Sequence, residues 1–138
     1  MQRGAFTFAE CLVACAILAI VVLGMASVLV SAHASSSYSL HSMRAVHLAE
    51  EMAERTLAVP YASIASFNGR NESPGQLKDI AGSLYPYNYQ VFSRQVATQV
   101  QGQAVAPLGG TVNGTLVTVT VTDQKGQSWV ATRFIPES

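Results

Sequence analysis

The sequence contains little charge, and neither sign is in excess. Of its 138 residues, eight are Lys or Arg and eight are Asp or Glu, which together make up 12% of the chain. Proteins that bind nucleic acids use clustered Lys and Arg side chains to contact phosphates. A nucleic-acid partner is therefore not expected, and the length fits a single domain better than two.

Cysteine is also scarce. Cys11 and Cys15 are the only cysteines, and both lie inside an apolar run near the N-terminus. They cannot form a disulfide framework for a domain that follows, and no third or fourth ligand lies near them to complete a metal site. The sequence also has no recognisable nucleophile–base arrangement and no phosphate-binding glycine loop, so we expect no catalytic residues, no metal, no cofactor and no enzyme activity.

Helix-breaking residues are nearly absent from the first sixty positions. No proline precedes Pro60, and Gly24 is the only glycine between Gly4 and Gly69. Proline also pushes the residue before it out of the helical region. These features predict one long helix over about residues 6–59.

The first half of this helix is long and apolar enough to cross a membrane. Residues 11–30 carry no charge, and at about 1.5 Å per residue they span roughly 30 Å, the thickness of the hydrocarbon core. The cationic Arg3 before the run places the N-terminus in the cytoplasm. A cleavable secretory signal is the competing interpretation, since Ala32-His33-Ala34 resembles its cleavage site, but its apolar region is usually only about 7 to 15 residues long.

The second half of the helix is amphipathic. Small and apolar residues recur there at three- and four-residue spacing, which predicts a face that packs on a sheet. The residues of this face are Ala45, Leu48, Ala49, Met52, Ala53 and Thr56. Glu51 and Arg55 have the favourable i,i+4 order of an ion pair. His33, His41 and His47 are not spaced as a ligand pair, and we expect them to be solvated or to lie in a subunit contact.

The residues after Pro60 predict a small head, residues 60–138. Gly, Asn, Ser and Pro are frequent up to Pro86, which indicates a loop with a short helical turn near residues 77–81. Strand-like runs follow at residues 87–96, 115–122 and 127–135, with a hairpin at residues 123–126 and a long loop at residues 101–114. In the middle strand Val117, Val119 and Val121 alternate with threonines, as in a half-buried antiparallel sheet. The predicted fold class is α+β.

The segment before the apolar run carries the most specific motif. Arg3-Gly4-Ala5-Phe6-Thr7-Phe8-Ala9-Glu10 resembles the processing site of type IV prepilins and pseudopilins, in which a short basic leader precedes an aromatic residue and a glutamate at mature position five. Cleavage after Ala5 reproduces both features, with leader residues 1–5. Cleavage between Gly4 and Ala5 is the alternative, because the family has glycine where Ala5 stands. Residues 10–14, 48–51 and 59–61 further resemble I-type minor pseudopilins and pilus-modification minor pilins.

The resemblance implies a function and a location. A prepilin peptidase would remove the leader, Phe6 would be N-methylated, and Glu10 would pair with the new amine during filament assembly. The expected partners are other pilin or pseudopilin subunits and the assembly machinery of the inner membrane, with a pilin-like head in the periplasm or outside the cell. Thr7 is expected to act with Glu10 in assembly, and the two residues also fit a capping box, which would serve the helix start in any case.

Two other interpretations remain open at this point. The chain could be a signal-anchored extracytoplasmic binding module that does not polymerise, or a pseudopilin for DNA uptake. Removal of the leader favours a filament subunit over an uncut anchor, and salt-sensitive retention of DNA would favour the uptake protein.

Overall fold

A computed structural model of the chain describes residues 7–105 and 109–137. Its longest element is α1 (Phe8–Leu57), which agrees with the predicted long helix. Contacts divide the chain after Leu40 into two compact units, residues 1–40 and 41–138. The first half of α1 belongs to one unit and the second half to the other, and we describe each separately.

The described part of the first unit is helix with its side chains exposed. Every residue from Thr7 to Leu40 is exposed, and large apolar side chains such as Phe8 and Leu23 keep 80% and 70% of their surface accessible. The helix is long and apolar enough to cross a membrane once. It is the one candidate span among the described residues.

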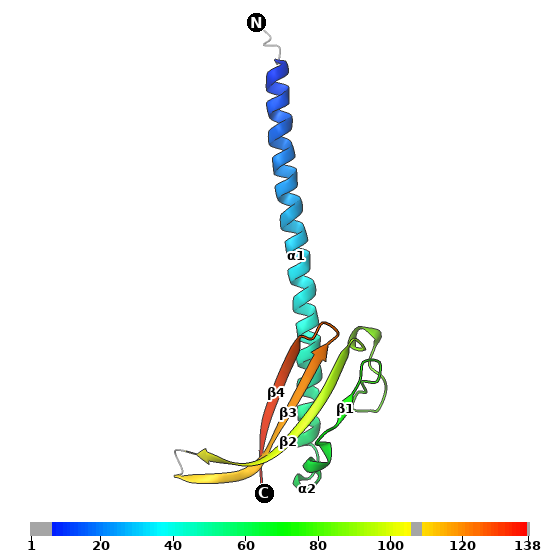
Figure 1. Cartoon of the computed structure of the whole chain (residues 1–138), viewed down its shortest axis with the longest axis vertical. Helices are drawn as coiled ribbons and strands as arrows, with labels where there is room; N and C mark the ends of the chain where they lie inside the picture. The colour runs from blue at the N-terminus through cyan, green and yellow to red at the C-terminus, as the bar shows by residue number, and fades with distance from the viewer. Residues whose placement is uncertain (1–6, 106–108, 138) are drawn as a thin grey trace. The chain divides into compact units, whose positions relative to one another are not determined.

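The second unit contains a four-stranded antiparallel sheet with the strand order β1-β2-β3-β4 (Figure 1). Its strands are β1 (Asn71–Glu72), β2 (Phe92–Val105), β3 (Gly110–Asp123) and β4 (Ser128–Pro136). The short helices α2 (Tyr61–Ile64), η1 (Ala65–Phe67) and η2 (Tyr87–Tyr89) lie between α1 and β2 in the sequence. The structure therefore confirms the α+β class and the antiparallel sheet.

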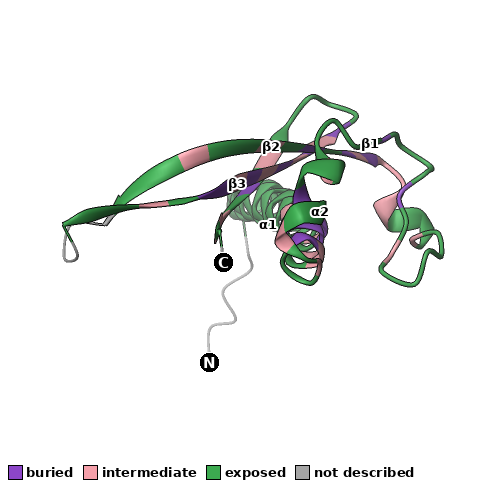
Figure 2. Cartoon of the chain, turned by 90° about the horizontal axis from the view of Figure 1, so that it is seen from below, coloured by how far each residue is buried: buried purple, intermediate pink, exposed green. Residues whose placement is uncertain are grey.

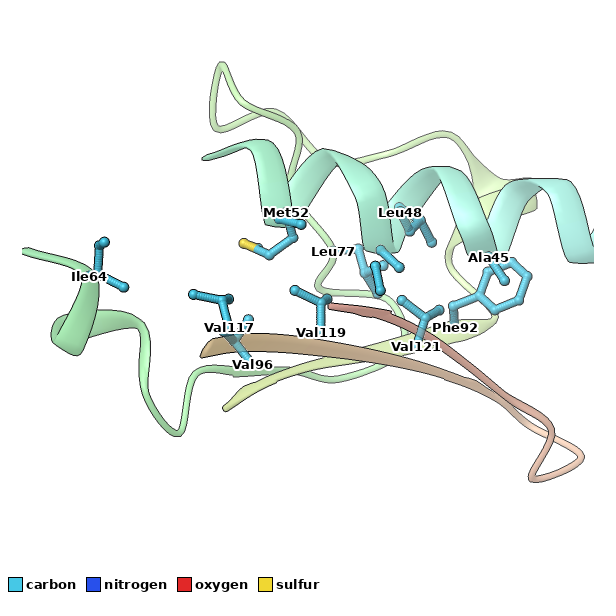
Figure 3. Packing of buried hydrophobic residues seen from close by; sticks show 13 residues of the cluster. Ala45, Leu48, Met52, Ile64, Leu77, Phe92, Val96, Val117, Val119 and Val121 are labelled. Atoms are coloured by element: carbon cyan, nitrogen blue, oxygen red, sulfur yellow. The ribbon is translucent and has the colours of Figure 1, made fainter. Parts of the chain in front are cut away.

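The core lies between the second half of α1 and one face of the sheet (Figure 3). The six helix residues predicted to face the sheet are the buried residues of α1. Across from them, Val117, Val119 and Val121 are fully buried. Burial of apolar side chains is the main favourable term in folding, so this contact stabilises the head.

Two predictions about the segment before β2 were wrong. The strand predicted at residues 87–96 begins at Phe92, because residues 87–89 form the helical turn η2 after Pro86. The turn expected at residues 77–81 is not helical: Lys78 pairs with Leu84 in a β-bridge. Gly82 supports this reversal with a φ of +84°, which glycine adopts without strain.

The prediction of a long loop at residues 101–114 was also wrong, because β2 continues to Val105 and β3 begins at Gly110. Their pairing continues without interruption from Phe92 opposite Asp123 to Val105 opposite Gly110. Glycine at position 114 suggested a loop, but here it permits close packing: a Cβ would lie 2.4 Å from the Ile135 carbonyl oxygen. We call Gln99–Val105 and Gly110–Thr115 the arm, and Figure 2 shows it extending beyond the helix-covered part of the sheet.

Candidate functional site

The predicted processing site lies outside the described residues. Gly4, Ala5 and Phe6 belong to residues 1–6, so both cleavage positions and the methylation of Phe6 remain predictions. The described structure begins at Thr7, immediately before the first residue of α1.

Thr7 and Glu10 form the predicted capping box. The backbone N–H and the hydroxyl of Thr7 donate to Oε2 of Glu10 at 2.8 and 2.9 Å. In return, the backbone N–H of Glu10 donates to the Thr7 hydroxyl at 3.4 Å. These bonds satisfy backbone donors that a helix start otherwise leaves unpaired. The structure confirms the cap and does not test the role of either residue in assembly.

The carboxylate of Glu10 retains capacity for a further partner. Both Thr7 donors approach Oε2, and within the described residues Oε1 receives no hydrogen bond. A carboxylate has about four acceptor positions on its two oxygens. Capping the helix and pairing with an additional cation are therefore compatible roles for this side chain.

Shallow apolar grooves run along the helix surface after Glu10. One is lined by Ala9, Glu10, Val13, Ala14 and Ile17, and a second, further along the helix, is lined by Val21, Gly24, Met25, Val28 and Leu29. Each has a volume of about 410 Å³. Small residues on a membrane helix let another helix approach closely. These surfaces therefore suit helix–helix packing.

A second polar cluster lies inside the head, around the buried side chain of Arg94. Its guanidinium donates to Glu72 Oε2 at 2.9 and 2.5 Å and to Glu51 Oε2 at 3.0 Å. It also donates to the carbonyl oxygens of Leu48 and Lys78 at 3.2 and 3.0 Å. A guanidinium has five N–H groups, so its donor capacity is fully used. The cluster ties α1, β1, β2 and the intervening loop together.

Glu51 is the second centre of this cluster. Arg55 donates to its Oε1 at 2.6 Å, which confirms the predicted i,i+4 pair, and the Tyr85 hydroxyl donates to its Oε2. Burial alone would raise the pKa of Glu51, but hydrogen bonds from Tyr85, Arg55 and Arg94 outweigh it and hold the pKa below its usual range. Burial and the Glu51 charge raise the pKa of Tyr85.

The burial of Arg94 was not predicted from the sequence. Its position relative to Phe92 and Val96 was the available signal, because alternate residues of a strand share a face. Both of those neighbours are buried. A charged side chain in a strand usually faces solvent, and the two acidic partners that compensate the guanidinium, Glu51 and Glu72, are distant in sequence.

His41 also departs from expectation, because it packs within the head. Its Nε2 lies 3.1 Å from Asp123 Oδ2, and its ring lies 4.6 Å from that of Phe92 and 5.8 Å from that of Trp129. Burial tends to raise the pKa of Asp123, but the Gln127 N–H, the His41 ring and the Lys125 N–H lower it. The pair joins α1 to the turn between β3 and β4.

The described residues contain no group of three or more His, Cys, Asp and Glu side chains that could hold a metal ion. Cys11 and Cys15 are free and exposed. No protein-family model, curated protein or solved structure matches the chain. What the structure shows is a pilin-like arrangement: one long apolar N-terminal helix whose second half packs on an antiparallel sheet.

Proposed function

We propose that this protein is a minor pilin or pseudopilin subunit, anchored in the inner membrane by α1 and assembled into a filament after leader cleavage. The observation that carries the proposal is the uncovered apolar half of α1. The most apolar segment of the helix is entirely exposed, whereas one face of the second half of the same helix is buried against the sheet. Such a surface needs lipid or other helices around it.

Assembly would replace the lipid around the apolar half of α1 with neighbouring helices. A subunit can leave the bilayer only if neighbouring helices replace lipid around its apolar surface, and the grooves beside Ala14 and Gly24 permit close approach. Glu10 would be costly in lipid when ionised. Pairing its carboxylate with the amine of processed Phe6, in its own or a neighbouring subunit, would favour docking in one register.

Mass measurement of the mature N-terminus tests the processing step. In a host with prepilin peptidase, we expect a chain that starts at methylated Phe6. A chain that starts at Ala5 would correct the register, and an uncut chain in a peptidase-competent host would favour a signal-anchored binding module instead.

Two substitutions separate the roles of the capping box. Glu10→Ala removes the carboxylate, whereas Thr7→Ala removes the hydroxyl that pairs with it and leaves the charge in place. We expect both variants to insert and to be cleaved, and only Glu10→Ala to be strongly depleted from sheared filaments. Equal incorporation of Glu10→Ala and parent would reduce Glu10 to a helix cap.

A further inference from the structure

The outer edge of the arm, on the side of β2 away from β3, has backbone N–H and C=O groups without a hydrogen-bond partner among the described residues. On β2, the N–H and C=O of Val96 bond outward, to Arg70 and Gly69, and Thr98 N–H bonds outward to the Asn68 side chain. Alternate residues of a strand direct these groups to the same side. The outward groups of Val100, Gly102 and Ala104 follow, and within the described residues no hydrogen bond reaches them.

This edge also lacks the usual protection against pairing. Proteins block exposed edges with charged side chains, proline or bulges. From Gln95 to Thr122 the sequence has no Asp, Glu, Lys or Arg, and the described strands of the arm contain no proline. Val100, at the base of the arm, is 77% exposed. An uncharged strand fits this edge better than a phosphate or an acidic peptide does.

The same chain carries a second open edge, on β4. The Glu137 N–H donates to the Asn113 carbonyl and the Gln127 carbonyl accepts from the Asp123 N–H, so the backbone N–H and C=O groups of odd-numbered residues point toward β3. The backbone groups of the even-numbered residues of β4 therefore point outward. These residues include Val130, which is 60% exposed. Pro136 is one of them, so its missing N–H costs the β3–β4 ladder nothing. Among the described residues, the one bond to these outward groups is from Arg133 to the Thr132 carbonyl.

We propose that the arm edge of β2 pairs with the outer edge of β4 in a second copy of this chain. The direction of the strands decides which edges of two copies can pair. Successive strands of the sheet are antiparallel, so β2 and β4 run in the same direction. Two heads related by a simple translation keep the same strand direction, and they join β2 of one copy to β4 of the other as parallel neighbours. Arm-to-arm pairing of the antiparallel kind would require one head to be inverted.

The contact implies a displacement between neighbours. Gly114 lies opposite both Gln101 and Pro136, so the arm continues past the end of β4 in its own subunit. To place Gln103 beside Thr132 of the next copy, that copy must shift by about six residues along the strand, roughly 20 Å. Because the two surfaces differ, the contact is open-ended and can repeat in a row of subunits. The inference rests on the proposed membrane-anchored subunit and adds a contact between heads.

Cysteine crosslinking of the full chain in membranes tests the contact. In a Cys11→Ser, Cys15→Ser background, one tagged version carries Gln103→Cys and another carries Thr132→Cys. Both positions are exposed and lie on the sheet face away from the core. We expect a disulfide-linked dimer when the two versions are co-expressed and none when either is expressed alone. No dimer in the mixture, or a dimer of Gln103→Cys alone, would overturn the proposal.

A proline variant supplies the matched control. Val100→Pro, added to the Gln103→Cys version, removes one outward N–H and leaves the β2–β3 ladder intact, whereas Val100→Thr keeps the N–H. We expect loss of the crosslink with proline only, while the unfolding transition seen by Trp129 fluorescence remains that of the parent. A crosslink that survives proline would indicate random collision and overturn the proposal. Leader cleavage measured on the same samples separates its failure from failure of the proposed function.

Discussion

The two halves of α1 are both rich in apolar and small residues, but their surroundings are opposite. From Phe8 to Leu40 every residue is exposed, whereas the half that starts at His41 buries a face of six residues against the sheet. The first half carries one charge among its described residues, Glu10, while the second includes Arg44, Glu50, Glu51, Glu54 and Arg55. The comparison shows that periodicity separates a helix face covered by the sheet from an apolar helix that is a candidate membrane span.

The buried charge cluster gives the largest expected effect on the covered half. Arg94→Met would keep much of the side-chain volume but leave Glu51 and Glu72 without their shared cation. Removing one partner of a buried pair costs about 3 to 5 kcal/mol. We expect Arg94→Met to lower the free energy of unfolding by about that amount, measured by urea unfolding of the full chain in detergent micelles with Trp129 fluorescence.

Arg133→Met is the control for this prediction. Arg133 pairs with Glu50, but the two side chains are 45% and 38% exposed. Exposed pairs contribute about 0 to 1 kcal/mol. If both variants lost equal stability, the Arg94 cluster would be no more important than a surface ion pair.

Two leucines, one in each half of α1, test the difference between the halves directly. Leu48 is fully buried against the sheet, and Leu18 is 63% exposed on the apolar half. Truncating a buried leucine to alanine costs about 2 to 5 kcal/mol. We expect Leu48→Ala to destabilise the head by this amount and Leu18→Ala to leave the same unfolding transition unchanged. A similar loss in both variants would mean that the two halves fold as one cooperative unit.

The sequence predicted best what depends on local pattern. Helical spacing identified the buried face of α1, and strict alternation identified Val117, Val119 and Val121. The prediction from sequence failed where contacts between residues far apart in the sequence determine the structure. Arg94 is buried because Glu51 and Glu72 meet it from other elements, and the strands continue past Gly102 because fourteen residues of β2 pair with β3. Of the predicted site, the Thr7–Glu10 cap was readable because both partners lie within one helical turn.

Lowering the pH should have the smallest effect on stability. The effect should again fall on the head, which contains the second half of α1. The pKa of Glu51 is below its usual range because the hydrogen bonds from Tyr85, Arg55 and Arg94 outweigh burial, and the pKa of Asp123 is lowered as well. A carboxyl group with a lowered pKa in the folded state stabilises the fold above its unfolded pKa, which is about 4.3 for glutamate. That contribution is lost as the pH falls through the lower, folded value.

We therefore expect the Tm of the head to be steady from pH 7 to about 5 and to fall below about 4. Tyr85→Phe removes a hydrogen bond that holds the Glu51 pKa down, so this variant should have a lower Tm at pH 7 and a shallower decline in acid. Tyr87→Phe is the matched control, because Tyr87 is 85% exposed and should behave as the parent does. Thermal unfolding followed by Trp129 fluorescence from pH 7 to 3 measures all three proteins. An equally steep acid decline in Tyr85→Phe and parent would show that Glu51 does not carry the pH dependence, which would then rest with Asp123 at the turn between β3 and β4.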